Sequence, residues 1–148
     1  MPLAQRSAEV VWNGNLTQGN GTVTATSSGA YKDLPVTFAS RTENPDGKTS
    51  PEELLAAAHA ICYAMVIANT LNRAGTPPQQ LIVNAVCSLD RVEGGLKITA
   101  MDLNIRGKVP GIDQATFQRT AQEGEQACPV SNALRGNVEI RVNATLEQ

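Results

Sequence analysis

The sequence predicts an α+β fold in which a mostly antiparallel sheet wraps one face of a long central helix. Three observations support it: one long segment with strong helix signals, alternating β-branched segments on both sides of that segment, and a turn over residues 93–95 that joins two strands as a hairpin. With 148 residues, the chain has the length of one domain, so we expect residues 1–148 to form a single domain.

Three strands and a loop are expected before the helix. Residues 8–12 are apolar and β-branched, and residues 20–27 alternate in the manner of a strand. Residues 31–38 give a third strand, which Pro35 places at a sheet edge. Residues 41–48 are polar and predict a loop that leads into the helix.

The central helix is predicted over residues 49–74. Ser50 is a good N-cap, Pro51 occupies the first helical position, and Glu53 completes a capping box with Ser50. Gly75 ends the helix.

The body of this helix has no polar stripe. From Leu54 to Ala68 only His59 interrupts a run of apolar and small residues. A helix that is apolar all round is buried on all sides, so we expect the rest of the chain, with or without a second copy of it, to cover this one. The run is shorter than the roughly 20 residues of a membrane span and contains a histidine, so we expect no membrane partner.

A β-hairpin is predicted after the helix. Residues 80–90 and 96–105 alternate on either side of the turn at residues 93–95. The apolar side of the first strand comprises Leu81, Val83, Ala85, Cys87 and Leu89.

Two helices and a last strand complete the chain. Asp113 is the expected N-cap of a helix whose apolar side comprises Ala115, Phe117 and Ala121. Cys128 and Pro129 begin a new helix, and residues 137–146 alternate as a strand.

Composition excludes several classes of function. A net charge of −2, no basic run and 3% aromatic residues argue against nucleic acid as a partner. Residues 1–6 form no apolar signal segment, so the expected compartment is the cytoplasm. Three cysteines do not indicate a disulfide framework, and one histidine without paired cysteine spacing argues against a metal site.

Cys62 and Cys128 are the candidate reactive residues, because a thiolate is a strong nucleophile. Cys128 stands near a helix N-terminus, which lowers a thiol pKa, whereas Cys62 lies in an apolar run, where burial raises it. A functional Cys62 therefore needs a cation from elsewhere. The candidates are Arg41, Arg73, Arg119 and Arg135. The alternative is that Cys62 and Cys128 are buried apolar residues, which is also our interpretation of Cys87.

Two further side chains are associated with Cys62 by their spacing. His59 precedes it by three residues and shares its helical face. This histidine could act as a general base, form half of a metal site, or be a hydrogen-bonded core residue. Glu52 precedes it by ten residues, about 15 Å along a helix. The two would meet only if two such helices packed antiparallel; otherwise Glu52 is simply an acid in the first turn.

Residues 49–62 and 127–131 closely resemble the OsmC/Ohr family of thiol-dependent hydroperoxide reductases. Residues 109–112 and 38–41 resemble its OsmC (osmotically inducible protein C) branch, and the resemblance covers essentially the whole chain. It implies an OsmC-like α+β fold, with antiparallel sheets wrapped around long central helices in an intertwined homodimer. It also implies two active sites at the dimer interface.

The same resemblance assigns roles to four residues. Cys62 matches the peroxidatic cysteine, Cys128 the resolving cysteine, Arg41 the arginine that stabilises the thiolate, and Glu52 the glutamate that holds this arginine. His59 and Tyr63 match the family's letters and receive no role.

The implied reaction reduces organic hydroperoxides, with hydrogen peroxide left open, to alcohols through a Cys62 sulfenic acid and a Cys62–Cys128 disulfide. An external dithiol or lipoyl-type reductant recycles the enzyme, and no cofactor is expected. The family implies an antioxidant role in oxidative and osmotic stress. Three alternatives stay open: a redox-sensing or binding module without turnover, a structural dimer with inert cysteines, and a metal-binding protein.

Overall fold

The computed structural model describes residues 1–147. The chain divides into two compact units, one from Met1 to Leu54 and one that begins at Leu55, and each is described by itself. The single domain over residues 1–148 stays a prediction.

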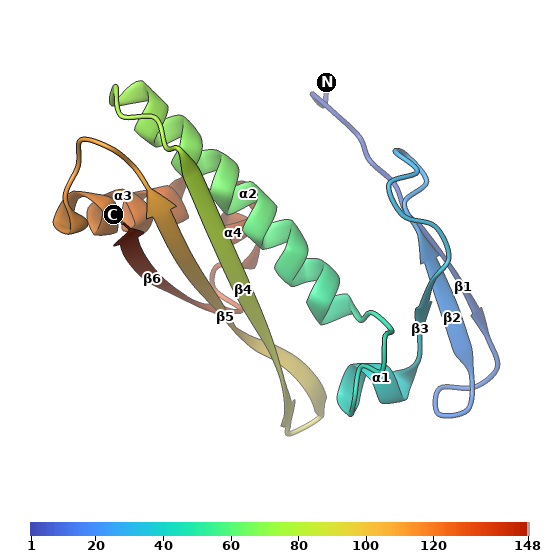
Figure 1. Ribbon diagram of the computed structural model, residues 1–148. Coiled ribbons are helices and arrows are strands. Elements are labelled where there is room, and N and C mark those ends of the chain that lie inside the picture. Colours follow the sequence, from blue (N-terminus) through green and yellow to red (C-terminus); the bar gives the residue numbers. More distant parts are fainter. Residues whose placement is uncertain (148) are drawn as a thin grey trace. The chain divides into compact units, whose positions relative to one another are not determined.

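The first unit contains a three-stranded antiparallel sheet (Figure 1). Its strands are β1 (Glu9–Asn13), β2 (Asn20–Thr24) and β3 (Leu34–Val36), in that order across the sheet. The strand β3 lies at the edge, as Pro35 predicted, because proline cannot donate a hydrogen bond to a further strand.

A short helix, α1 (Phe38–Thr42), follows β3, where the sequence predicted the end of a strand and a polar loop. Thr37 is its N-cap: the Thr37 side chain accepts from the Ser40 N–H, and the Ser40 hydroxyl accepts from the Thr37 N–H. The usual capping-box signal has Glu or Gln in the second position, so this serine variant escaped prediction. As a result Arg41 lies on a helix rather than in a loop.

The long helix α2 (Pro51–Arg73) begins and ends within a residue or two of the prediction. The Glu53 N–H donates to Ser50 Oγ at 3.1 Å, which is one half of the predicted capping box. The Glu53 carboxylate instead accepts from the Thr49 hydroxyl at 2.9 Å. Gly75, with φ of 80°, allows the left-handed turn that ends the helix.

The second unit holds a three-stranded sheet in the order β4-β5-β6. The strands β4 (Gln80–Val92) and β5 (Gly95–Lys108) form the predicted antiparallel hairpin. After α3 (Gln114–Ala127) and α4 (Pro129–Leu134), β6 (Glu139–Glu147) pairs parallel to β5. The other strand pairs of the described residues are antiparallel, as predicted. The β5–β6 pair is the parallel exception, because a crossover through two helices returns the chain in the same direction.

The core of the second unit lies between α2, α3 and one face of the sheet (Figure 1). The inner face of α2 contributes Tyr63, Ile67 and Leu71, and α3 contributes Phe117 and Ala121. The predicted apolar side of β4 packs against this cluster through Leu81, Val83, Ala85 and Cys87. Ala115 was also predicted on the apolar side of α3, but it is exposed. The buried face of α3 is therefore narrower than predicted.

The opposite face of α2 is apolar and exposed within one chain. Ile61 is 58% exposed and Met65 is 67% exposed, so the chain alone does not bury the helix on all sides. The helix has 23 residues and a mean hydropathy of 1.7 over an 18-residue window, so it is long and apolar enough to cross a membrane. The prediction that its apolar run is too short for a membrane span therefore does not hold. The buried, hydrogen-bonded His59 and Tyr63 on its inner face are typical of a core helix.

The packing of β5 against α3 gives a stability prediction. A Cβ atom at Gly107 would lie 2.6 Å from Cζ of Phe117, a fully buried and rigid ring. We expect Gly107→Ala to lower the free energy of unfolding by about 1–3 kcal/mol, measured by urea denaturation, because the ring must move in a packed core.

The exposed neighbour on the same strand gives a matched control: Lys108→Ala should change stability by less than about 0.5 kcal/mol. Adding Phe117→Leu to Gly107→Ala should recover part of the loss. If Gly107→Ala behaves like Lys108→Ala, the described packing at this point is wrong.

Candidate active site

Cys62 and Cys128 lie next to each other in the second unit. Cys62 is half-buried on α2, and Cys128 is fully buried at the junction of α3 and α4. Their sulfur atoms are 3.4 Å apart, and the Cys128 thiol donates a hydrogen bond to Cys62 Sγ. The structure therefore brings together the two cysteines that the sequence singled out, although they are 66 positions apart in the chain.

Cys128 stands at a corner where one helix ends and the next begins. It is the C-cap of α3, where its N–H donates to the Glu125 carbonyl at 3.3 Å, and the N-cap of α4, with Pro129 following as predicted. Its side chain makes no cap hydrogen bond with α4. The thiol is directed at Cys62 instead.

An ion pair between the partly exposed Arg135 and the buried Glu125 links the two helices at this corner. Arg135 Nη1 lies 2.9 Å from Oε1 of Glu125, and Arg135 Nη2 donates a hydrogen bond to the Glu125 carbonyl at 3.3 Å. Glu125 is 4% exposed, so this charge needs its partner. Arg135, one of the cations considered for Cys62, is thus engaged by Glu125.

The second unit does not by itself activate Cys62. Burial raises the pKa of the Cys62 thiol, a hydrogen bond with the backbone of Val130 lowers it, and the neighbouring Cys128 raises it again. The balance is a raised pKa, as the apolar run in the sequence predicted. A nucleophilic Cys62 therefore still requires a cation.

His59 is a buried core histidine with a side-chain partner. Its Nε2 atom lies 2.7 Å from Ser131 Oγ, and both residues are fully buried. Burial lowers the pKa of His59, against an opposing effect of the Glu125 carboxylate. The described residues contain no group of three or more His, Cys, Asp or Glu that could hold a metal. Of the three interpretations of His59, the structure supports the hydrogen-bonded core residue.

Two buried residues that hydrogen-bond close to the cysteines had no role in the sequence prediction. Ser131 received no role, and Tyr63, whose hydroxyl donates to the Ala121 carbonyl at 2.7 Å, was left unassigned. A signal existed for Ser131: it follows Cys128 by three residues, as Cys62 follows His59 by three.

Arg41 and Glu52 form an ion pair in the first unit. Arg41 Nε donates to both oxygens of the Glu52 carboxylate, at 2.7 and 3.2 Å. Both bonds share the single N–H of Nε. Glu52 is buried, whereas the Arg41 side chain is 31% exposed.

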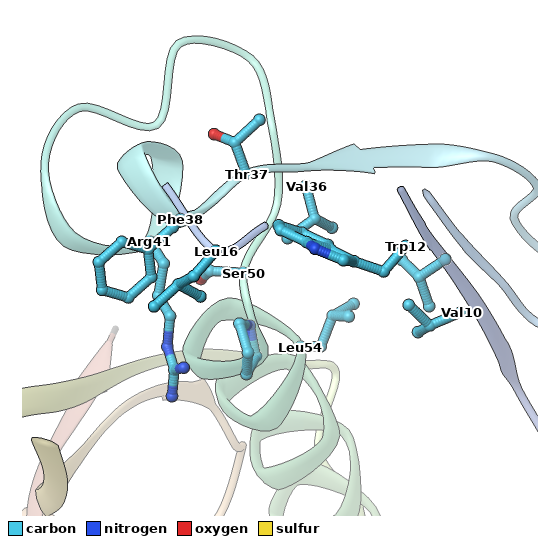
Figure 2. Close-up of a pocket in the computed structure, with 11 residues that line it drawn as sticks. Val10, Trp12, Leu16, Val36, Thr37, Phe38, Arg41, Ser50 and Leu54 are labelled. Carbon is cyan, nitrogen blue, oxygen red and sulfur yellow. The ribbon is translucent and has the colours of Figure 1, made fainter. Parts of the chain in front are cut away.

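An apolar pocket of about 370 Å³ borders Arg41 in the same unit. Its wall is formed by apolar side chains from the sheet, from α1 and from the first turn of α2, with Arg41 as its charged member (Figure 2). These apolar residues are Val10, Trp12, Leu16, Val23, Val36, Phe38, Pro51 and Leu54.

The four predicted site residues thus form two pairs, one in each unit. The arginine–glutamate pair belongs to the first unit and the cysteine pair to the second. The catalytic roles of Cys62, Cys128, Arg41 and Glu52 stay predictions.

Comparisons with known proteins identify the family. The model of the family described as OsmC-like protein matches residues 44–143. The Peroxiredoxin OsmC of Escherichia coli is 38% identical over 135 residues, which cover 91% of this chain and 93% of that protein. The chain belongs to the OsmC family.

Relatives of this OsmC-family chain include the organic hydroperoxide resistance protein of Xanthomonas axonopodis pv. citri, 34% identical over 94 residues, or 62% of this chain and 63% of that protein. A solved organic hydroperoxide resistance protein OsmC from Legionella pneumophila superposes with a TM-score of 0.75 at 25% identity, over 98% of this chain and 99% of that chain. These matches confirm the predicted OsmC-like α+β fold.

The neutral state of His59 gives a pH prediction. The unfolded chain takes up a proton at its single histidine near pH 6.5, whereas folded His59, with its pKa lowered, does not. The unfolded state therefore binds more protons, and we expect the free energy of unfolding to fall as pH decreases from about 7.5 to 5.5.

Urea unfolding at several pH values measures this effect, and His59→Gln should flatten the slope in that interval. An NMR titration of the single histidine in the folded protein provides a direct check. A folded-state midpoint at or above 6.5 would contradict the described burial.

Proposed function

We propose that this OsmC-family protein is a thiol peroxidase that reduces organic hydroperoxides to alcohols. The contact between Cys62 and Cys128 carries the proposal. Their sulfur atoms, 3.4 Å apart, need to approach by only about 1.4 Å to reach disulfide bond length. The names of the relatives, peroxiredoxin and organic hydroperoxide resistance protein, support the same chemistry.

The reaction proceeds in three steps. The Cys62 thiolate attacks one peroxide oxygen, the O–O bond breaks, and the alkoxide takes a proton and leaves as the alcohol, with Cys62 oxidised to a sulfenic acid. The Cys128 sulfur then attacks Cys62 Sγ, the S–O bond breaks, and hydroxide leaves as water with a proton. An external dithiol or lipoyl-type reductant supplies two electrons and two protons to restore both thiols. A reducing compartment such as the cytoplasm suits this cycle.

Arg41 is the proposed cation for the first step. Its guanidinium stabilises the Cys62 thiolate and the developing charge on the peroxide, and Glu52 orients it. Glu52 and Cys62 are ten residues apart on one helix, about 15 Å, so we propose that a second copy supplies the pair. The exposed apolar face of α2, with Ile61 and Met65, supports an antiparallel homodimer through this helix.

The pocket beside Arg41 supports the proposed substrate class. A hydroperoxide carries a polar O–O end and an organic tail, and the pocket pairs one guanidinium with an otherwise mostly apolar wall. The wall excludes water from the tail and favours an alkyl or aryl hydroperoxide over hydrogen peroxide.

The raised pKa of Cys62 favours one alternative: a redox-sensing module that forms the disulfide slowly and does not turn over. Such a protein would consume no more hydroperoxide than its own amount, even with excess dithiol.

Replacing the proposed nucleophile tests the function. With cumene hydroperoxide and excess dithiothreitol, the wild type should consume many equivalents of peroxide. Cys62→Ser should lower the rate at least about 10³-fold, because a serine hydroxyl is a poor nucleophile here.

Cys87→Ala is the matched control, since Cys87 of β4 has no role in the proposed reaction, and it should retain the wild-type rate. Full activity of Cys62→Ser would refute the proposal. Consumption of a single equivalent by the wild type would favour the sensor.

The proposed cation gives a second prediction. Arg41→Ala should lower kcat/KM for the hydroperoxide by about 10²–10³-fold, because the thiolate and the peroxide lose their stabilising charge. The pH at which kcat/KM rises should also move upwards, since the Cys62 thiol loses the cation that favours its thiolate.

Glu52→Gln, which weakens the hold on the guanidinium, should give a smaller loss in the same direction. Arg119→Ala removes an exposed arginine of α3 and should leave both the rate and the pH profile unchanged. An unchanged pH profile in Arg41→Ala would exclude this arginine as the activating cation.

A further inference from the structure

Each cysteine of the pair has a hydrogen-bonding residue three positions away on its own helix. His59 precedes Cys62 on α2, and Ser131 of α4 follows Cys128, the N-cap of that helix. Residues three apart lie on the same helical face, so both residues of each pair take part in the contact between the two segments. The thiols lie 3.4 Å apart, and the His59–Ser131 hydrogen bond is 2.7 Å long.

We propose that the His59–Ser131 hydrogen bond positions Cys128 for the disulfide-forming step. The inference rests on the proposed peroxidase function and deepens it, because neither residue is part of the nucleophile, the cation or the carboxylate that holds it. His59 and Ser131 are positioning residues that act through the placement of the two sulfur atoms.

The helix α4 needs such an anchor. It has six residues, and a helix of this length depends on its tertiary contacts. Its N-cap, Cys128, contributes no side-chain hydrogen bond to it. Arg135 ties α4 to Glu125 of α3, but that link lies within the corner and does not reach α2. Three side-chain hydrogen bonds join α2 to α4 and its N-cap within residues 1–147: the thiol contact, the bond between Cys62 and the Val130 backbone, and the His59–Ser131 bond. Of these, only the His59–Ser131 bond does not involve a reacting sulfur atom.

The His59–Ser131 hydrogen bond is buried, so breaking it would be costly and it holds α4 in place against α2. Both residues are fully buried, so a hydrogen bond lost there is not replaced by one to bulk water. The second nitrogen of His59, Nδ1, has no hydrogen-bond partner within the described residues, so the bond to Ser131 is what orients the ring. Tyr63, one residue after Cys62, ties α2 to the Ala121 carbonyl of α3. Cys62 thus lies between two buried attachments.

The effect belongs to the second chemical step rather than the first. His59 uses Nε2 for Ser131, and burial disfavours its protonated form, so it supplies no positive charge to a Cys62 thiolate. In the second step the Cys128 sulfur must reach Cys62 Sγ while the S–O bond breaks and water leaves. A corner held in place keeps the attacking sulfur close, which raises its effective concentration.

A competing reaction makes the role measurable. A Cys62 sulfenic acid that waits for Cys128 can react with a second peroxide to give a sulfinic acid, which dithiols do not reduce. Slower disulfide formation therefore appears as more sulfinic acid at Cys62 for each molecule of peroxide consumed.

Single-turnover kinetics on Ser131→Ala test the proposal. With cumene hydroperoxide, sulfenic acid formation should stay within about twofold of wild type, whereas the following disulfide formation should slow about tenfold, as expected for one lost buried hydrogen bond. Peptide mass spectrometry should find a several-fold larger fraction of sulfinic Cys62. The conservative single variant His59→Gln, whose amide can still bond to Ser131, should retain most of the wild-type rate of disulfide formation.

Gln114→Ala is the matched control. Its amide makes two hydrogen bonds that tie α3 to β6, to the Ala144 carbonyl at 2.9 Å and from the Leu146 N–H at 2.7 Å, away from the cysteines. It should lower stability without changing either rate. Equal rates in Ser131→Ala and Gln114→Ala would overturn the positioning role and leave the peroxidase function intact. If wild type forms no Cys62–Cys128 disulfide with the hydroperoxide, the proposed function fails, and the positioning role fails with it.

Discussion

The burial of one face of α2 against the β4–β6 sheet and α3 is the interaction on which the cysteine site depends. Tyr63, Ile67 and Leu71 are almost completely removed from solvent on this face, which fixes the rotation of the helix. That rotation places Cys62 where Cys128 can reach it and brings His59 to Ser131. Close packing at this face therefore controls the distance between two sulfur atoms on separate helices.

The same packing leaves a chemical problem. A thiol held in an apolar setting resists ionisation, and the contacts of the second unit raise the pKa of Cys62. The first unit contains the complementary feature, an arginine held by a buried carboxylate at the edge of an apolar pocket. In the proposed peroxidase these features meet in a homodimer, where apolar surroundings select an organic substrate and Arg41 supplies the charge.

Local signals in the sequence predicted much of this structure, and contacts between distant segments escaped it. Ser50, Pro51 and Gly75 mark the ends of α2, and Cys128 with Pro129 marks the α3–α4 corner, because caps act over a few residues. No local pattern reports that Cys62 and Cys128 touch across 66 residues; the family resemblance supplied that pairing. The parallel β5–β6 pair and the His59–Ser131 bond were missed for the same reason, since tertiary packing decides them.

The most direct test of the central claim is a thiol titration before and after one equivalent of cumene hydroperoxide, with mass spectrometry of the peptides. The account predicts that two thiols disappear as an intrachain Cys62–Cys128 link, that dithiothreitol restores them, and that the cycle repeats many times. If no thiol is lost, the two cysteines are inert core residues, and the chain has the OsmC fold without peroxidase chemistry.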